Sequence, residues 1–203
     1  MKRFAFGIRF KTGSNNELMV GRCLKVLHGY QCLHNINSIG VTFPGFSDKT
    51  IGEMIGFVSA DRLCLRQLMT QDYFQEMVNL KKFFIHEIMV VPDNVSEVRY
   101  MRDQKRDKQC VGGRQRQIRR GQRIAKKAGY DYQPRQDKAG SEHQINFFHN
   151  IPITSSRDAG KVFYFRIQKY AVDDKVYGKY SSYGLGNQGD GRGTVPDPIF
   201  INI

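Results

Sequence analysis

The sequence lacks several patterns that mark common protein classes. Its cysteines show no paired C-x-x-C spacing, so neither a zinc site nor a disulfide framework is predicted, and no metal or other cofactor is expected. No run of about 18 apolar residues occurs, so a transmembrane helix is not expected. The opening segment MKRFAFGIRF alternates charges with aromatics and does not read as a signal peptide, which favours a cytoplasmic protein.

Acidic residues are also missing from one long segment, residues 108 to 130. Residues 97 to 127 hold twelve Lys and Arg against three acids, and so supply +9 of the formal net charge of +13. Solvated charged helices usually interleave acids with their cations to form i,i+4 pairs. A patch of one sign is typical of a polyanion site. Nucleic acid is favoured over a membrane surface, because the segment has almost no apolar face to insert.

A helix is predicted within this basic segment, from about residue 113 to residue 128. Its cations recur at positions i, i+3, i+4, i+7 and i+11 of one helix face: Arg116, Arg119, Arg120, Arg123 and Lys127. Gly129 is predicted to end the helix, and Gly121 inside the helix should cost about 1 kcal/mol relative to Ala. Because so polar a helix gains little from packing, we expect it to order fully only on its ligand.

The first 92 residues alternate between strand-like and helix-like patterns, and we predict an α+β fold. A strand of alternating aromatics is followed by a helix, two strands, a second helix and a last strand. This is the ferredoxin-like β-α-β-β-α-β order shared by RNA-recognition domains. The elements are predicted near residues 4–10, 16–28, 38–44, 53–58, 61–80 and 83–92. Residues 1–92 are therefore predicted to form a ferredoxin-like (RRM-like) domain.

The second half, residues 93–203, is predicted to be an RNA-binding C-terminal domain. After Pro92 the composition becomes polar, and an extended or looped segment is expected up to about residue 113. The arginine-rich helix, a linker over 130–143 and a small β-structure with a strand over 162–168 follow.

Several segments resemble one protein family in their order and spacing. They are VLHGYQCLHNINSIGVTFP (26–44), VVP (90–92), Arg102-x-Gln104 with the arginine-rich helix, SSYGLGN (181–187) and VPDPIF (195–200). Together they resemble the type I-F CRISPR RNA-processing endoribonucleases over nearly the whole chain. The resemblance implies a ferredoxin-like half and a second half that lays its arginine helix into the major groove of a repeat hairpin.

The resemblance also implies a reaction and partners. The enzyme would be a metal-independent endoribonuclease, specific for the sequence and hairpin of the CRISPR repeat, that cuts precursor RNA at the 3′ base of the stem. It would then stay bound to the mature RNA handle. Its partners would be the repeat stem-loop RNA and the other subunits of a type I-F interference complex.

His28 matches the catalytic histidine of this family. Metal-free cleavage needs a base near the ribose 2′-hydroxyl, which then attacks the adjacent phosphate and leaves a 2′,3′-cyclic phosphate and a 5′-hydroxyl. Imidazole suits this task because its pKa lies near working pH. We expect His28 to end the first helix. The alternative is a helix-terminal histidine that interacts with the last carbonyls.

Two further residues match catalytic positions of the family. Ser156 would position the 2′-hydroxyl, although the family's usual S-x-S-T-G reads Ser156-Arg157-Asp158-Ala159-Gly160 here, so phosphate contacts from the missing serine and threonine are not expected. A strand-entry turn is the alternative for this segment. Tyr183 matches the active-site tyrosine, and its alternative is a packed tyrosine beside a turn.

The remaining candidate residues would hold RNA. Phe163 would stack beneath the terminal base pair of the stem, or else be an ordinary core residue. Arg102 and Gln104 would read guanine and adenine edges, unless they lie in a solvated loop. The phosphate-binding candidates are Arg114, Arg116, Arg119, Arg120, Arg123, Lys126 and Lys127.

Two other functions are consistent with the sequence. One is a catalytically weak or inactive subunit that binds the same hairpin, which the altered Asp158-Ala159 segment favours. The other is an unrelated basic RNA-binding module of the translation machinery.

Overall fold

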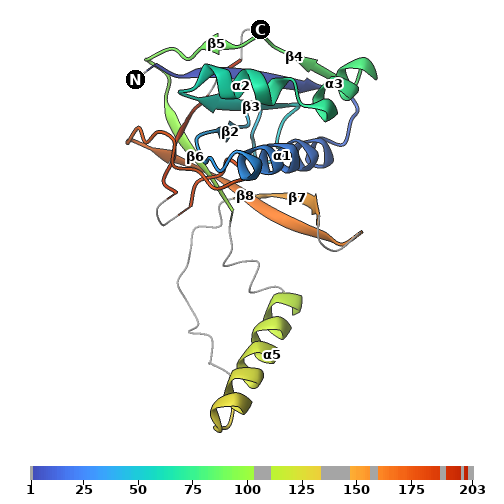
Figure 1. The fold of residues 1–203 in the computed structure, drawn as a ribbon, viewed down its shortest axis with the longest axis vertical. Coiled ribbons are helices and arrows are strands. Elements are labelled where there is room, and N and C mark those ends of the chain that lie inside the picture. Colours follow the sequence, from blue (N-terminus) through green and yellow to red (C-terminus); the bar gives the residue numbers. More distant parts are fainter. Residues whose placement is uncertain are drawn as a thin grey trace. The chain divides into compact units, whose positions relative to one another are not determined.

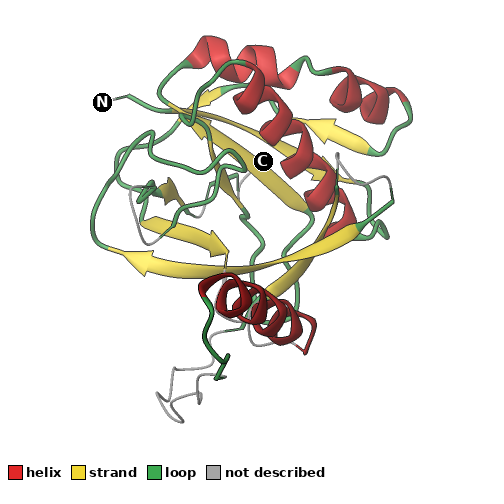
Figure 2. Cartoon of the chain, turned by 60° about the horizontal axis from the view of Figure 1, so that its bottom comes forward, coloured by secondary structure: helices red, strands yellow, loops and turns green. Residues whose placement is uncertain are grey.

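The computed structural model describes residues 2–102, 111–133, 147–155, 160–187, 191–197 and 199–200. Within 111–117 it describes the backbone, but of the side chains only that of Gln115. The chain forms two compact units, Met1–Arg102 with Phe148–Ile203, and Asp103–Phe147. Helices and antiparallel strands are mixed along the chain, which confirms the α+β class (Figure 2). Among the described helices, none is both long enough and apolar enough to cross a membrane. The division predicted at residue 92 stays a prediction.

The first sheet has five antiparallel strands in the order β2-β3-β1-β4, with β5 also pairing with β1. Along the chain its strands and the helices between them are β1 (Phe4–Phe10), α1 (Asn16–Leu33), β2 (Gly40–Thr42), β3 (Met54–Ser59), α2 (Arg62–Met69), α3 (Asp72–Asn79), β4 (Phe83–Ile85) and β5 (Met89–Val90). Phe6, Ile8 and Phe10 recur every second residue in β1 and are all buried, as the alternation predicts, and Phe4 is partly buried. Ala5 and Gly7 between them are buried as well, so the middle of the strand is covered on both faces rather than half-buried.

The second sheet has four antiparallel strands in the order β7-β8-β6-β9. They are β6 (Glu97–Arg102), β7 (His149–Thr154), β8 (Val162–Val172) and β9 (Val195–Pro196). The predicted strand over 162–168 is the first part of β8. β6 lies in the segment that was expected to be extended or looped, and it forms a strand because Val98 and Tyr100 alternate into the core.

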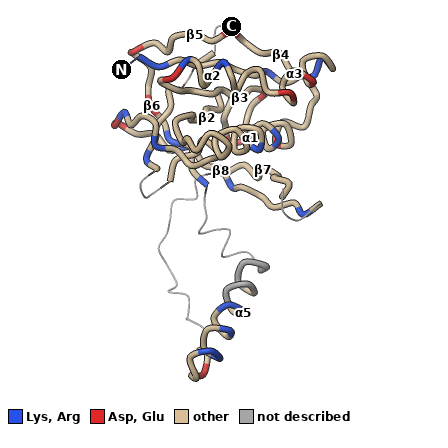
Figure 3. Tube along the Cα trace, in the orientation of Figure 1, with Lys and Arg blue, Asp and Glu red and all other residues tan. Residues whose placement is uncertain are grey.

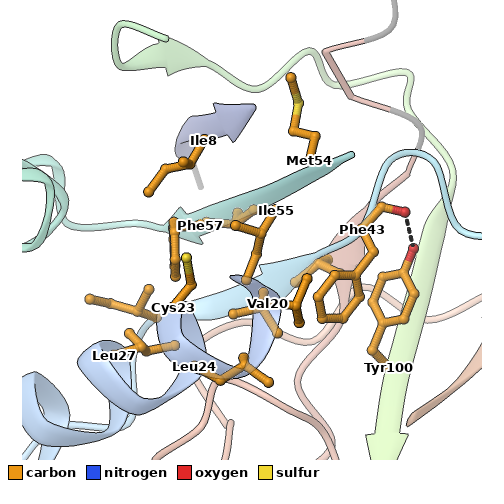
Figure 4. Close-up of a cluster of buried hydrophobic side chains, with 14 of the residues drawn as sticks. Ile8, Val20, Cys23, Leu24, Leu27, Phe43, Met54, Ile55, Phe57 and Tyr100 are labelled. Carbon is orange, nitrogen blue, oxygen red and sulfur yellow. Dashed lines mark hydrogen bonds between the residues drawn. The ribbon is translucent and has the colours of Figure 1, made fainter. Parts of the chain in front are cut away.

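α1 packs against both sheets, through β3 on one side and β7 on the other (Figure 1). One helix face points into the core, with Val20, Cys23, Leu24 and Leu27 at the spacing i, i+3, i+4 and i+7. Figure 4 shows these side chains gathered beside the strands of the first sheet. This packing fixes the position of the helix residues that follow, His28 among them.

Polar contacts tie the second sheet to the rest of the unit. The hydroxyl of Tyr100 in β6 donates to the backbone oxygen of Phe43 at 3.1 Å, the dashed line in Figure 4. Arg3 and Glu97 form a buried ion pair. Thr194 Oγ1 also donates to Glu97 Oε2, at 2.8 Å. The carboxylate thus has partners from both ends of the chain, as a buried charge requires.

α1 extends beyond its predicted end. The helix runs to Leu33 and is capped by His34, so the expectation that His28 ends it is wrong. Tyr30 and Gln31 continue the buried face and are 3% and 1% exposed. Tertiary packing of these two residues therefore prolongs the helix. Because His28 lies inside the helix, the alternative of a helix-terminal histidine does not apply.

The segments predicted as a second helix and a last strand are each divided in two. Gln71 adopts extended backbone between α2 and α3, with φ −60° and ψ 138°. Leu68 and Phe74 are both buried, yet six residues apart they would lie on different faces of one continuous helix. The break lets both reach the core. The predicted last strand is likewise two short strands, β4 and β5, with residues 86–88 between them.

Two glycines of α1 predict opposite effects of alanine. A Cβ at Gly21 would lie 2.0 Å from the backbone oxygen of Pro152 in β7, and Gly21→Ala should destabilise the protein by about 3 kcal/mol. A Cβ at Gly29 would meet nothing within 4 Å, so Gly29→Ala should stabilise it by up to about 1 kcal/mol. Urea unfolding measures both. Similar effects at the two positions would contradict the close approach of α1 and β7.

Candidate active site

Side chains from distant parts of the sequence meet beside the last turns of α1. The His28 ring stacks on the Tyr183 ring with centroids 4.2 Å apart and planes at 3°. His28 Nδ1 lies 2.9 Å from Ser182 Oγ, within hydrogen-bond distance. The structure therefore brings together two of the three predicted catalytic residues, His28 and Tyr183. It adds Ser182, which the sequence did not single out.

The loop that carries Ser182 and Tyr183 is a tight turn docked on α1 and β2. Gly184 N donates to Ser181 O at 2.8 Å, and Gly184 O accepts from Val41 N at 3.0 Å. Gly184 has φ +73°, and a Cβ there would lie 2.7 Å from Leu27 Cδ2. Both the backbone angle and the space therefore require glycine. The turn places the two preceding side chains against His28.

Gln31 of α1 holds this turn through hydrogen bonds to its backbone. Sequence reasoning missed this residue too. Its amide nitrogen is 3.3 Å from Ser181 O and 3.1 Å from Ser182 O, and it donates to both. Its amide oxygen accepts from Ile39 N at 3.1 Å. The signal that could have found it is a glutamine at a position where the helical spacing from Leu27 calls for a core residue. A buried amide in such a place needs partners.

A row of aromatic rings continues from the histidine along β8. Tyr183 meets Phe165 edge-on at 4.8 Å and 77°, and Phe165 lies 5.6 Å from Phe163. The guanidinium of Arg102, at the end of β6, stacks over Phe165 with Cζ 4.2 Å from the ring centroid. Arg102 is therefore held at the site by a cation–π contact, with its planar guanidinium oriented by the ring.

The protonation states suit proton transfer. Burial lowers the pKa of His28, so its imidazole is neutral at neutral pH, the form that accepts a proton. Burial raises the pKa of Tyr183, and the charge of Arg102 only partly opposes this, so the phenol keeps its proton. A neutral imidazole beside a neutral phenol can act as a general base towards a hydroxyl group.

Several other candidates can be placed only in part. Ser156 and Gln104 lie outside the described residues, and their roles stay predictions. Ser155 N donates to Lys161 O at 2.9 Å and so closes the β7–β8 connection in which Ser156 lies. Phe163 is half-buried beside Phe165, which leaves both its stacking role and its core role open.

The second unit contains α5 (Val111–Ala128), which is described here by itself. Five of the predicted phosphate-binding side chains are exposed on it: Arg119, Arg120, Arg123, Lys126 and Lys127. Figure 3 shows Lys and Arg positions, drawn in blue, recurring along the trace of this helix. Arg114 and Arg116 belong to the helix, but their side chains are outside the description. Gly121 lies against Tyr132, whose Cε2 would be 2.1 Å from a Cβ there, so this glycine allows the ring to pack on the helix.

The helix ends at a glycine, as the sequence predicts. Gly129 has φ +74°, and Tyr130 N donates to Ala125 O at 3.1 Å, a geometry typical of helix C-termini. Among the residues that the structure describes, no group of three or more His, Cys, Asp or Glu side chains is placed to hold a metal ion.

A family model described as CRISPR-associated protein (Cas_Csy4) matches residues 11–197 of the chain. The matched range contains His28, Ser182 and Tyr183 as well as α5. No curated protein matches the chain.

Solved structures of CRISPR RNA-processing enzymes show a limited likeness. Csf5, a type IV Cas6 crRNA endonuclease, is 11% identical, with 92% of this chain and 98% of that one covered and a TM-score of 0.35. A CRISPR RNA-processing endoribonuclease Cas6b is 12% identical, with 97% and 100% covered and a TM-score of 0.33. TM-scores this low do not establish a shared fold, so the family match alone identifies the chain.

Proposed function

Because the chain belongs to the Csy4 family of CRISPR-associated proteins, RNA-binding endoribonucleases that process CRISPR RNA, we propose that it cuts a repeat hairpin without a metal ion. We assign it to the type I-F subtype and place the cut at the 3′ base of the stem. The observation that carries the proposal is a neutral imidazole, His28, stacked on Tyr183 and hydrogen-bonded to Ser182.

The proposed reaction starts at the 2′-hydroxyl next to the scissile phosphate. His28 Nε2 takes the hydroxyl proton, and the 2′-oxygen attacks phosphorus. The bond from phosphorus to the 5′-oxygen breaks, and the imidazolium returns its proton to the departing oxygen. The products are a 2′,3′-cyclic phosphate and a 5′-hydroxyl. Ser156 would position the 2′-hydroxyl, and the Tyr183 phenol can donate a hydrogen bond within the site.

Recognition is divided between two sets of residues in this proposal. Arg102 can donate two bonds to guanine O6 and N7, and Gln104 can bracket adenine N6 and N7. Phe163 would stack beneath the terminal base pair of the stem. The exposed cations of α5 would contact phosphates, which gives affinity without base preference. Residues 1–92 would then supply the base, and residues 93–203 would hold the RNA.

The product would remain bound after the cut. The readers and the phosphate contacts lie on the stem, upstream of the cut, so cleavage removes none of them. We therefore propose that the protein keeps the mature RNA handle and enters a type I-F interference complex with it.

One observation favours a second candidate function, a subunit that binds the hairpin with little or no cleavage. Asp158 and Ala159 replace the serine and the threonine that would contact the phosphate in the family pattern. A carboxylate near a phosphodiester opposes the charge that develops in the reaction. Binding without cutting would follow if Asp158 faced the scissile phosphate.

Cleavage of type I-F repeat hairpins in EDTA tests the proposal. We expect a single cut at the 3′ base of the stem that leaves a 2′,3′-cyclic phosphate, and no cut in a hairpin with a 2′-deoxy substitution at that nucleotide. The deoxy hairpin should still bind and serves as the matched control. Cleavage that requires a divalent ion, or that survives the deoxy substitution, would exclude the chemistry. Binding without a cut would favour the second candidate, and no preference for hairpins would indicate an unrelated basic module.

A further inference from the structure

The two ring nitrogens of His28 have different surroundings. Nδ1 lies 2.9 Å from Ser182 Oγ. Among the contacts that the structure describes, Nε2 meets only Cys32 Sγ, at 3.9 Å. Only one nitrogen of a neutral imidazole carries the proton, and the hydrogen bond made by one nitrogen decides which it is.

The stacking partner fixes the plane of the ring but not its edges. Tyr183 lies parallel to His28 at 3°, so a half-turn of the imidazole about its bond to Cβ would keep the same stacking. Such a turn would exchange the edge that faces Ser182. A directional contact in the ring plane is needed to choose between the two orientations, and the Ser182 hydroxyl supplies one.

Cys32 does not supply this contact. Its sulfur is 3.5 Å from Nδ1 and 3.9 Å from Nε2, so it lies at nearly the same distance from both nitrogens. A group bonded in line with one nitrogen would be much farther from the other. A thiol is also a weak donor and acceptor. Cys32 therefore packs beside the ring without distinguishing its edges.

The position of Ser182 is itself determined by buried contacts. Gln31, which is 1% exposed, donates to the carbonyl of Ser182 and to that of Ser181. Gly184 closes the turn two residues later. Because these contacts hold the backbone, the side chain of Ser182 can be changed without moving the turn.

We propose that Ser182 is a positioning residue that accepts the Nδ1–H of His28 and so leaves the lone pair of Nε2 for the RNA. The inference rests on the proposed role of His28 as base. In this arrangement the base nitrogen points to the substrate in the correct tautomer. Gln31 supports Ser182 in turn, and neither residue touches the reacting atoms.

The test combines nitrogen NMR of the His28 ring in the RNA-free protein with single-turnover cleavage across pH. In the wild type we expect the Nδ1–H form. Ser182→Ala should shift the ring towards the Nε2–H form and lower the cleavage plateau roughly 10- to 100-fold, the usual cost of losing a group that orients a functional histidine. The hairpin Kd should not change. Ser182→Thr keeps the hydroxyl and should restore both readouts.

The pH profile of cleavage separates an effect on the orientation of the His28 ring from an effect on its pKa. Cleavage should rise with pH through the pKa of His28, which burial holds below its ordinary value of 6.5, and then level off. Among the described residues, the titratable groups that face this corner of the site are Cys32, Tyr183 and Arg102. Ser182→Ala should lower the plateau and leave the rising limb in place. Cys32→Ala, the matched control, should leave the plateau and the tautomer unchanged.

The outcomes distinguish this inference from the proposed function. An unchanged tautomer and rate in Ser182→Ala, with an active wild type, would overturn the role of Ser182 alone. A changed tautomer in a protein that never cuts RNA would support the role of Ser182 and overturn the proposed function. If Ser182→Ala folds poorly, Ser182→Cys replaces it in the test. Cysteine nearly keeps the side-chain volume but loses most of the hydrogen bond, so the same shift of tautomer and the same loss of rate are expected.

Discussion

His28→Ala should slow hairpin cleavage by about two to four orders of magnitude, the range expected when a general base is lost. Affinity for the hairpin should stay at the wild-type level. His28 is neutral at working pH because burial lowers its pKa, so its removal takes no positive charge from the RNA-binding surface. Single-turnover cleavage in EDTA and a separate binding titration measure the two effects.

His34→Ala is the matched control. His34 caps the same helix and its ring lies 4.5 Å from that of Tyr30, so its loss also removes a histidine–aromatic contact from α1. We expect wild-type cleavage from this variant. His28→Gln, which can still bond to Ser182 but has no titratable base, should be as slow as His28→Ala. Rapid cleavage by either His28 variant would exclude His28 as the base.

Replacing Arg119, Arg120 and Arg123 together by Gln should lower hairpin affinity roughly 100-fold near physiological salt. All three side chains are exposed on α5, and Gln is about as good a helix former as Arg, so the helix should persist. Each lost phosphate contact should also reduce the slope of log affinity against log salt by about 0.7 to 0.9. Binding titrations between low and high salt measure both quantities.

The control removes the same charge elsewhere. Lys11, Arg66 and Lys82 are exposed in the first unit, and their replacement by Gln should change the salt slope little. Arg102→Ala should have a different effect. It should reduce discrimination between repeat sequences by about 1 to 3 kcal/mol per base pair read, and leave most of the slope of log affinity against log salt. Equal slopes in the α5 and control variants would contradict a phosphate-binding role for α5.

Local pattern predicted much of the secondary structure, and the errors have tertiary causes. The alternation in β1 and the start of α1 at Asn16, capped by the side chain of Asn15, follow from nearest neighbours in the sequence. The end of α1 depends instead on what Tyr30 and Gln31 touch. β7 was missed because its strand is held by pairing with β8 and by the approach of α1, neither of which a local pattern records.

The site divides in the same way. His28 and Tyr183 could be named from the family resemblance, and the structure places their rings in contact. Ser182 could not, because a serine in a turn acquires meaning only when the two segments meet. Gln31 could have been noticed as a polar residue at a core position, but its role also depends on the turn that it contacts. The contacts of Ser182 with His28 and of Gln31 with the turn span 150 or more residues of the chain. Arg102 was predicted as a reader, but its cation–π contact with Phe165 follows from the β6–β8 register alone.

The separation of 154 residues between His28 and Ser182 has a consequence for a chain still on the ribosome. At about 5 to 20 residues per second, Ser182 is made roughly 8 to 31 seconds after His28. In the last third of that interval the nascent protein contains the histidine, Arg102 and α5, but not yet the turn that we propose orients the imidazole. In the proposed function, the residues that would hold RNA are therefore synthesised before the turn that would orient the base, so that binding would precede cleavage in a growing chain.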